Sequence, residues 1–181
     1  MYRFSLGAIV PVSQKDVFQE VTRFDIHLNS APSVYRVDRK NGDTSTPRFT
    51  IHLRRFGTSG TIRTQVITTE TPTLLTWRAE RPIAGRWYIT RRDDSTSHIT
   101  IELFIEPGLI DRLPLGVNVV RSGVLSLLRR TFRKEVRPVL ESIVSAGDGD
   151  PSEMELTGIE VERIEDLHLD ELLNGDGHPS E

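Results

Sequence analysis

Apolar and polar residues alternate along most of residues 33–106, and a period of two is typical of β-strands that bury one face. In residues 97–105 the apolar residues Ile99, Ile101, Leu103 and Ile105 fall at odd positions, and mostly polar residues lie between them. Turn residues separate the alternating segments, so the pattern predicts a meandering antiparallel sheet. The predicted strands are 2–10, 34–39, 48–56, 61–70, 74–80, 85–91 and 97–105.

Two segments instead follow the helical period. The first begins after Pro11, with Ser13 as the expected N-cap and Asp16 three residues later, a weaker form of the capping box. Its apolar stripe is Val17, Phe18, Val21 and Phe24. The second runs to Ala146, and Pro138 inside it predicts a kink. Its apolar stripe is Val120, Val124, Leu127, Leu128, Thr131, Phe132, Val136, Leu140 and Ile143.

Charge divides the chain in two. Residues 1–147 contain 22 Lys and Arg against 14 Asp and Glu, a formal charge of +8. Residues 148–181 contain one cation, Arg163, against 12 carboxylates, a formal charge of −11. A segment of such composition repels itself and has few aromatic residues. The sequence therefore predicts one folded domain over 1–147 and an acidic, disordered tail over 148–181.

The residue composition excludes several kinds of site. The chain has no cysteine, so disulfides, thiolate catalysis and cysteine-bound metals are excluded. The five histidines show no ligand spacing, and no phosphate loop or nucleophile elbow is present. We therefore expect no metal and no cofactor. The chain begins without a basic leader and has no apolar stretch near the roughly 20 residues of a membrane span, which predicts a soluble, cytoplasmic protein.

Several short stretches point to a known family. They are VPVSQKDVF at 10–18, LTW at 75–77 after the Thr-Pro turn at 71–72, GRW at 85–87 and TSHIT at 96–100. Together with the order of strand, helical segment, about six strands and one long helix, they resemble the START-like superfamily, also called SRPBCC or polyketide cyclase-like. The resemblance covers residues 2–146, and its motifs are structural rather than functional.

The resemblance implies an α+β helix-grip fold, in which a curved antiparallel sheet of about seven strands wraps around the long C-terminal helix. It also implies a deep hydrophobic cavity between them, because members bind lipids, sterols, hormones, polyketides or quinones. The same positions form an ordinary core in most domains, and that alternative stays open. The candidate ligand-binding residues are Leu53, Thr64, Val66, Leu75, Trp77, Trp87, Ile89, Ile101 and Leu103 from strands, and Val120, Val124, Leu127 and Leu128 from the helix.

Two arginines occupy strand positions that face the same, inward side as these apolar residues. Arg55 follows Leu53 by two positions, and Arg91 follows Ile89 by two. Either they anchor a ligand carboxylate or phosphate, or they lie at strand ends and extend their stems to solvent. No catalytic residue is identified, so the favoured function is binding and transport of a hydrophobic small molecule. An aromatase/cyclase-type enzyme acting on a polyketide-like substrate is the alternative.

A cluster of cations lies on the polar side of the long helix: Arg129, Arg130, Arg133, Lys134 and Arg137. It is either a solvated face, a contact for an anionic membrane surface, or a docking site for the protein's own acidic tail. Nucleic acid is not an expected partner, since no RNA-binding motif accompanies the cluster. A third hypothesis makes the acidic tail the working part of a non-catalytic interaction protein.

Overall fold

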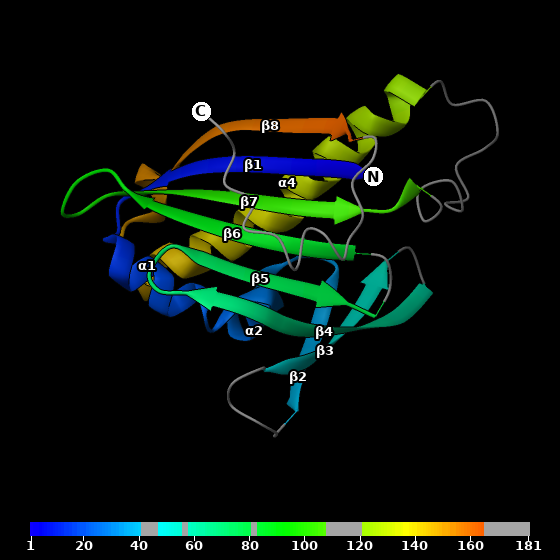
Figure 1. Cartoon of the computed structure of the whole chain (residues 1–181), viewed down its shortest axis with the longest axis horizontal. Coiled ribbons are helices and arrows are strands. Elements are labelled where there is room, and N and C mark those ends of the chain that lie inside the picture. Colours follow the sequence, from blue (N-terminus) through cyan, green and yellow to red (C-terminus); the bar gives the residue numbers. More distant parts are fainter. Residues whose placement is uncertain (41–46, 56–57, 81–82, 108–120, 165–181) are drawn as a thin grey trace.

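The computed structural model of the chain describes residues 1–40, 47–55, 58–80, 83–107 and 121–164. Within these ranges, eight strands form one antiparallel sheet in the order β2-β3-β4-β5-β6-β7-β1-β8 (Figure 1). The strands are β1 (Tyr2–Val10), β2 (Val34–Lys40), β3 (Arg48–Arg55), β4 (Thr58–Glu70), β5 (Leu74–Ala79), β6 (Ile83–Arg91), β7 (Ser97–Ile105) and β8 (Glu155–Arg163).

The register of the strands confirms the alternation seen in the sequence. In β1 and β7, Leu6 lies opposite Ile101 and Ala8 opposite Ile99. Directly opposed residues of an antiparallel pair point to the same side of the sheet, so these pairs share one face. All four are buried, which makes this the inner face of the sheet.

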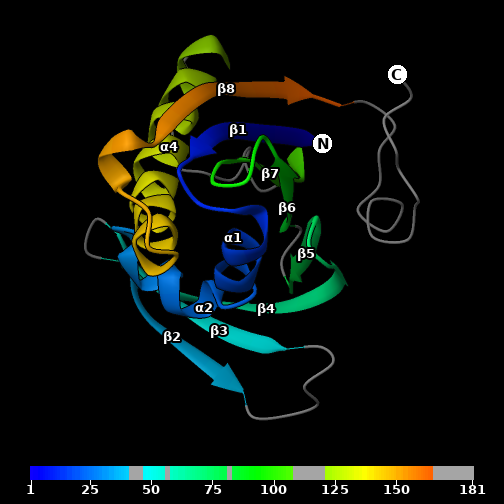
Figure 2. The same cartoon turned by 90° about the vertical axis from the view of Figure 1, so that its left-hand side faces the viewer.

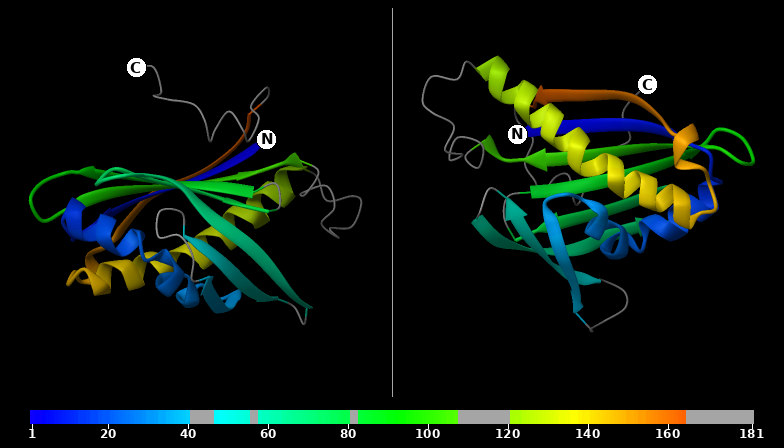
Figure 3. Two further views of the ribbon diagram at one scale, coloured as in Figure 1. Left: turned by 60° about the horizontal axis from the view of Figure 1, so that its bottom comes forward. Right: turned by 180° about the vertical axis from the view of Figure 1, so that it is seen from behind.

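The helices lie together on the inner face (Figure 3). They are α1 (Gln14–Val21), α2 (Phe24–His27) and α4 (Arg121–Ala146), with short 3-10 turns η1 (Leu28–Ser30) and η2 (Pro151–Glu153). Ser13 caps α1 as predicted, because its side chain accepts a hydrogen bond from the amide of Asp16. The first predicted helical segment, whose apolar stripe extends to Phe24, is divided into α1, α2 and η1. No helix in the described ranges is long and apolar enough to cross a bilayer.

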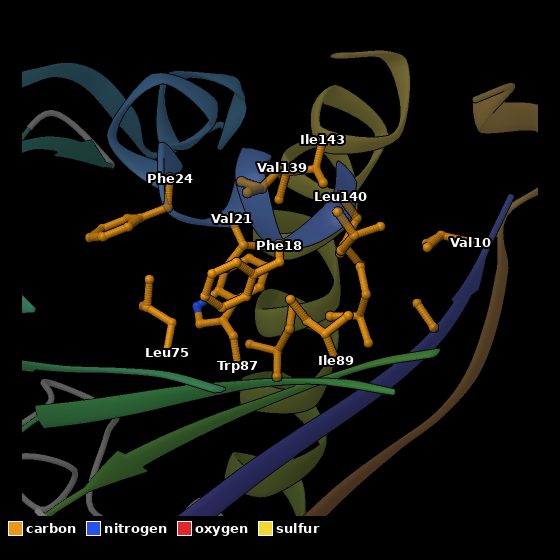
Figure 4. Packing of buried hydrophobic residues seen from close by; sticks show 14 of the residues in the cluster. Val10, Phe18, Val21, Phe24, Leu75, Trp87, Ile89, Val139, Leu140 and Ile143 are labelled. Carbon is orange, nitrogen blue, oxygen red and sulfur yellow. The ribbon is translucent and has the colours of Figure 1, made fainter. Parts of the chain in front are cut away.

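The curved sheet holds α4 and α1 against its inner face, as Figure 2 shows from the end of the molecule. The helix-grip architecture that the sequence predicts is therefore confirmed, and the described residues contain eight strands rather than about seven. The core forms where Leu140 and Ile143 of α4 and Val21 of α1 meet Trp87 and Ile89 of the sheet (Figure 4). Each fully buried side chain of this size contributes about 1.5–3 kcal/mol to stability.

The additional strand corrects the predicted domain boundary. Residues 155–163 are not a disordered tail but the strand β8, which pairs antiparallel with β1 at one edge of the sheet. Leu156, Ile159 and Val161 lie opposite Ala8, Leu6 and Phe4, so their apolar side chains extend the inner face. The net charge of the segment hid this apolar alternation. Residues 165–181 of the predicted tail lie outside the described residues.

Candidate functional site

The burial of α4 changes along its length, and this change defines the candidate site. In the C-terminal half, Leu140 and Ile143 are completely buried in the core. Toward the N-terminus, the apolar stripe continues through Val136, Phe132 and Leu128, but these side chains are only half-buried. The inner surface between the sheet and the N-terminal half of α4 is thus covered less completely by the described side chains.

The sheet presents half-buried apolar residues toward the same region. Trp77 of β5 and Phe132 of α4 are both partly buried and pack on the edge of the core. Leu103 of β7 and Leu53 of β3 are also half-buried, on the inner parity of their strands. Phe132 additionally contacts Phe4, with ring centroids 6.0 Å apart. We call this surface the apolar wall, defined by Trp77, Leu103, Leu128, Phe132 and Val136.

Gly85 determines where the Trp77 ring lies. The two residues are directly opposed on β6 and β5. A Cβ atom at position 85 would lie 2.5 Å from Cε2 and Cζ2 of Trp77, so the indole occupies the space that a side chain would take. This glycine therefore accommodates the tryptophan ring rather than leaving a hollow beside it.

The structure brings most of the predicted ligand-binding strand residues onto one surface. Six of them are buried on the inner face: Thr64, Val66, Leu75, Trp87, Ile89 and Ile101. Trp77 and Leu103 belong to the apolar wall together with Leu128 of α4. Leu53 is half-buried on the inner face as well, but it lies opposite Val34 and Gly60, farther along the sheet. The common placement of the predicted residues follows from the strand register, and their role in binding stays a prediction.

Two predicted members of the site lie elsewhere. Leu127 is 51% exposed, because it lies on a different side of α4 from the apolar stripe that packs against the sheet. Arg91 has the inward parity of Trp87, but it is at the end of β6, where its side chain is exposed and forms an ion pair with Asp94 of the hairpin. It therefore extends to solvent rather than anchoring a ligand at the inner face. Val120 and the side chains of Arg55 and Val124 lie outside the described residues.

A buried polar chain joins the helices beside the core, and sequence reasoning missed it. His27 of α2 is 3% exposed, and its Nε2 lies 3.0 Å from a carboxylate oxygen of Glu20 in α1. Its Nδ1 lies 2.9 Å from the hydroxyl of Ser142 in α4. Because His27 and Ser142 are 115 positions apart in the chain, only the tertiary structure could show this contact.

Acid, imidazole and hydroxyl occur here in the order that activates a serine nucleophile. Such chemistry also needs free backbone N–H donors to stabilise an oxyanion. Ser142 lies within α4, four residues before its end, where the backbone N–H groups bond within the helix. The contact therefore acts as a clamp that holds α1 and α2 against α4. Ser33, between η1 and β2, attaches the next segment of the chain to α4, because its amide donates to Glu135 at 2.9 Å.

An ion-pair cluster fastens β8 on the opposite, outer face of the sheet. Arg3 of β1 contacts Glu102 of β7 at 3.1 Å and Glu162 of β8 at 2.8 Å. Glu102 is buried there, and burial raises the pKa of its carboxyl group above the usual range, although Arg3 and Arg86 act in the opposite direction. Two acids therefore share one arginine across three strands.

The cationic cluster predicted on α4 is solvent-facing. Arg129, Arg130, Arg133, Lys134 and Arg137 are all exposed. Arg137 forms an ion pair with Glu141 at 2.8 Å, one helical turn along. We call these five residues the basic face of α4. The helix thus carries an apolar stripe toward the sheet and a basic surface toward solvent.

Solved structures with this arrangement are known. An aromatase/cyclase, Zhui from Streptomyces sp. R1128, superposes with a TM-score of 0.60 at 11% identity, covering 82% of this chain and 94% of that one. A START superfamily protein from Mycobacterium smegmatis gives a TM-score of 0.60 at 16% identity, covering 80% of this chain and 98% of that one. These likenesses establish that the chain has the START-like, polyketide cyclase-like fold.

A third similar structure is longer. The di-domain aromatase/cyclase BexL, from the BE-7585A biosynthetic pathway, gives a TM-score of 0.62 at 15% identity over 81% of this chain. The present chain spans half the length of that protein. No protein-family model and no curated protein sequence matches the chain. At such low identity the comparisons concern the fold alone.

Proposed function

We propose that the protein binds a hydrophobic small molecule, such as a lipid, polyketide or quinone, between the inner face of its sheet and the N-terminal half of α4. The observation that supports this most directly is the apolar wall, which joins half-buried side chains of facing elements, such as Trp77 and Phe132. Apolar surface left in water costs about 25 cal/mol per Å². A ligand that covers the wall recovers this free energy.

Transport of the bound molecule is the second part of the proposal, and the basic face of α4 supports it. Five exposed cations lie on the same helix as the apolar wall but point to solvent. Arginine and lysine clusters attract anionic lipid surfaces, at about 1 kcal/mol per residue near the membrane. Sedimentation with phosphatidylglycerol vesicles tests this contact, and binding that does not weaken with salt counts against it.

The alternative is an aromatase/cyclase-type enzyme, which the likeness to solved proteins of that name favours. On the inner face of the sheet, the buried polar side chains among the described residues are Thr64 and Ser97, and neither is an acid or a base at neutral pH. Binding is therefore better supported than acid–base catalysis. Cyclisation of a poly-β-keto thioester faster than in buffer would favour the enzyme.

A fluorescence titration tests the binding site itself. N-phenylnaphthylamine is neutral and brightens in apolar surroundings, and Trp77 at the site is an energy donor for it. We expect saturable binding of one dye per chain. Leu128→Gln should weaken binding about tenfold, because it removes part of the apolar wall. Leu127→Gln is the matched control, since the adjacent Leu127 is exposed. Non-saturable binding, or equal losses in both variants, would refute the proposed site.

A further inference from the structure

Thr64 introduces a single hydroxyl group into an otherwise apolar part of the inner face. It lies on β4, directly opposite Phe49 of β3 and Ala79 of β5. Val66 follows two positions along β4 and faces Trp77 across the strand pair. Thr64 is only 4% exposed, so its hydroxyl is withdrawn from solvent beside the apolar wall.

The hydroxyl oxygen of Thr64 has no hydrogen-bond partner among the described residues. The other buried hydroxyl of the inner face behaves differently, because Ser97 donates to the carbonyl oxygen of Val12 at 2.7 Å. Buried polar groups are nearly always hydrogen-bonded, since desolvation without a partner is unfavourable. A molecule from outside the chain could supply the missing partner.

A buried water molecule is a poor partner at this position. Ordered internal water makes about three hydrogen bonds, and it needs two to four polar groups around it. The residues that flank Thr64 on the inner face, Phe49, Val66 and Ala79, offer no polar side chain. A carbonyl oxygen differs from water, because one donor is enough to satisfy it within an apolar molecule.

We propose that Thr64 is the polar anchor of the ligand site and donates a hydrogen bond to a carbonyl oxygen on an otherwise apolar ligand. This inference rests on the proposed function and narrows it to oxygenated ligands such as ketones and quinones. A pure hydrocarbon would leave the hydroxyl unpartnered. A ligand with a charged head group would place its charge among the apolar side chains of Phe49, Val66 and Ala79. The cation over the Phe49 ring, Arg39 at 5.7 Å from the ring centroid, is itself exposed to solvent.

Fluorene and fluorenone form a probe pair that isolates this hydrogen bond, since their ring frames match and only the second has a carbonyl. Affinities are measured by titration calorimetry for the wild type and two variants. Thr64→Val removes the hydroxyl at nearly constant shape, and Thr64→Ser keeps it. We expect Thr64→Val to weaken fluorenone binding about 5- to 10-fold while fluorene binding is retained or improved. Thr64→Ser should keep the preference for fluorenone.

The outcomes separate the two proposals. If the wild type binds neither probe, the proposed function fails and this inference fails with it. If both probes bind but Thr64→Val weakens them equally or not at all, the site stands and the anchor is refuted.

The unfolding free energy of the ligand-free protein tests the inference independently. Thr64→Val should raise the unfolding free energy, because it removes a buried hydroxyl that has no partner. Ser97→Ala is the control and should lower the unfolding free energy, because it leaves the carbonyl of Val12 unpartnered. If Thr64→Val instead lowers it, the hydroxyl already has a partner within the chain and the inference is wrong.

Discussion

The contact between Gly85 and Trp77 predicts that adding one methyl group destabilises the protein. In Gly85→Ala, the new Cβ would lie 2.5 Å from two carbon atoms of the indole and 2.7 Å from Nε1. Carbon atoms in contact are normally about 3.5–4.0 Å apart, so the ring must move by roughly 1 Å or more. Trp77 is half-buried, so it can move only by giving up part of its packing.

The size of the effect follows from two opposing contributions. Overpacking in a well-packed region costs about 1–3 kcal/mol. Replacing glycine by alanine also restricts the unfolded chain, which stabilises the folded state by about 0.4–1 kcal/mol. The backbone at Gly85 does not lie in the left-handed region, so this gain applies in full. We expect a net loss of about 1–2 kcal/mol in the free energy of unfolding.

Urea unfolding followed by circular dichroism measures this loss, and a second substitution tests its cause. In a Trp77→Leu background the obstructing ring is absent, so Gly85→Ala should be neutral or stabilising. Gly60→Ala is the matched control, because a Cβ at Gly60 meets nothing within 4 Å. If Gly85→Ala costs as much in the Trp77→Leu background as in the wild type, steric contact with the indole is not the cause.

Three further predictions concern the contacts around the site. Ser142→Ala leaves Nδ1 of His27 without its partner and should lower the unfolding free energy by about 1–2 kcal/mol, whereas an unchanged value would mean that the helix clamp contributes nothing. Glu102 has a raised pKa in the folded protein, so the folded state binds more protons than the unfolded state above pH 4.5, and stability is lost as the pH rises through the folded pKa. In parallel urea titrations, Glu102→Gln should therefore gain unfolding free energy relative to the wild type as the pH rises from about 4 to neutrality. A difference in unfolding free energy that does not change with pH would contradict the burial argument. Ile159→Asp places a charge on the inner face of β8 and should cost at least about 2 kcal/mol, while Glu160→Gln on the exposed side should be neutral; equal effects would show that β8 does not pack as described.

The sequence alone predicted the strands and helices, because their signals come from residues that are near neighbours in the chain. Alternation of period two located the strands, and the parity of the positions alone predicts that Leu75 and Trp77 share one side of the sheet, as do Ile101 and Leu103. The Ser13 cap and the apolar stripe located the helices. These signals depend only on near neighbours in the chain. The likeness of four short motifs to a known family then supplied the topology, and the structural comparisons confirm it.

Only the tertiary structure decided the features that depend on distant residues. Residues 155–163 form a strand because β1 offers an unpaired edge and Arg3 neutralises Glu162, and neither condition is visible within the segment itself. Arg91 shares the parity of the inner face, but its position at a strand end lets it reach Asp94 and solvent. The unpartnered hydroxyl of Thr64 depends on what surrounds it in three dimensions. Periodicity fixes which face a side chain points to, whereas burial and pairing depend on what the fold places opposite it.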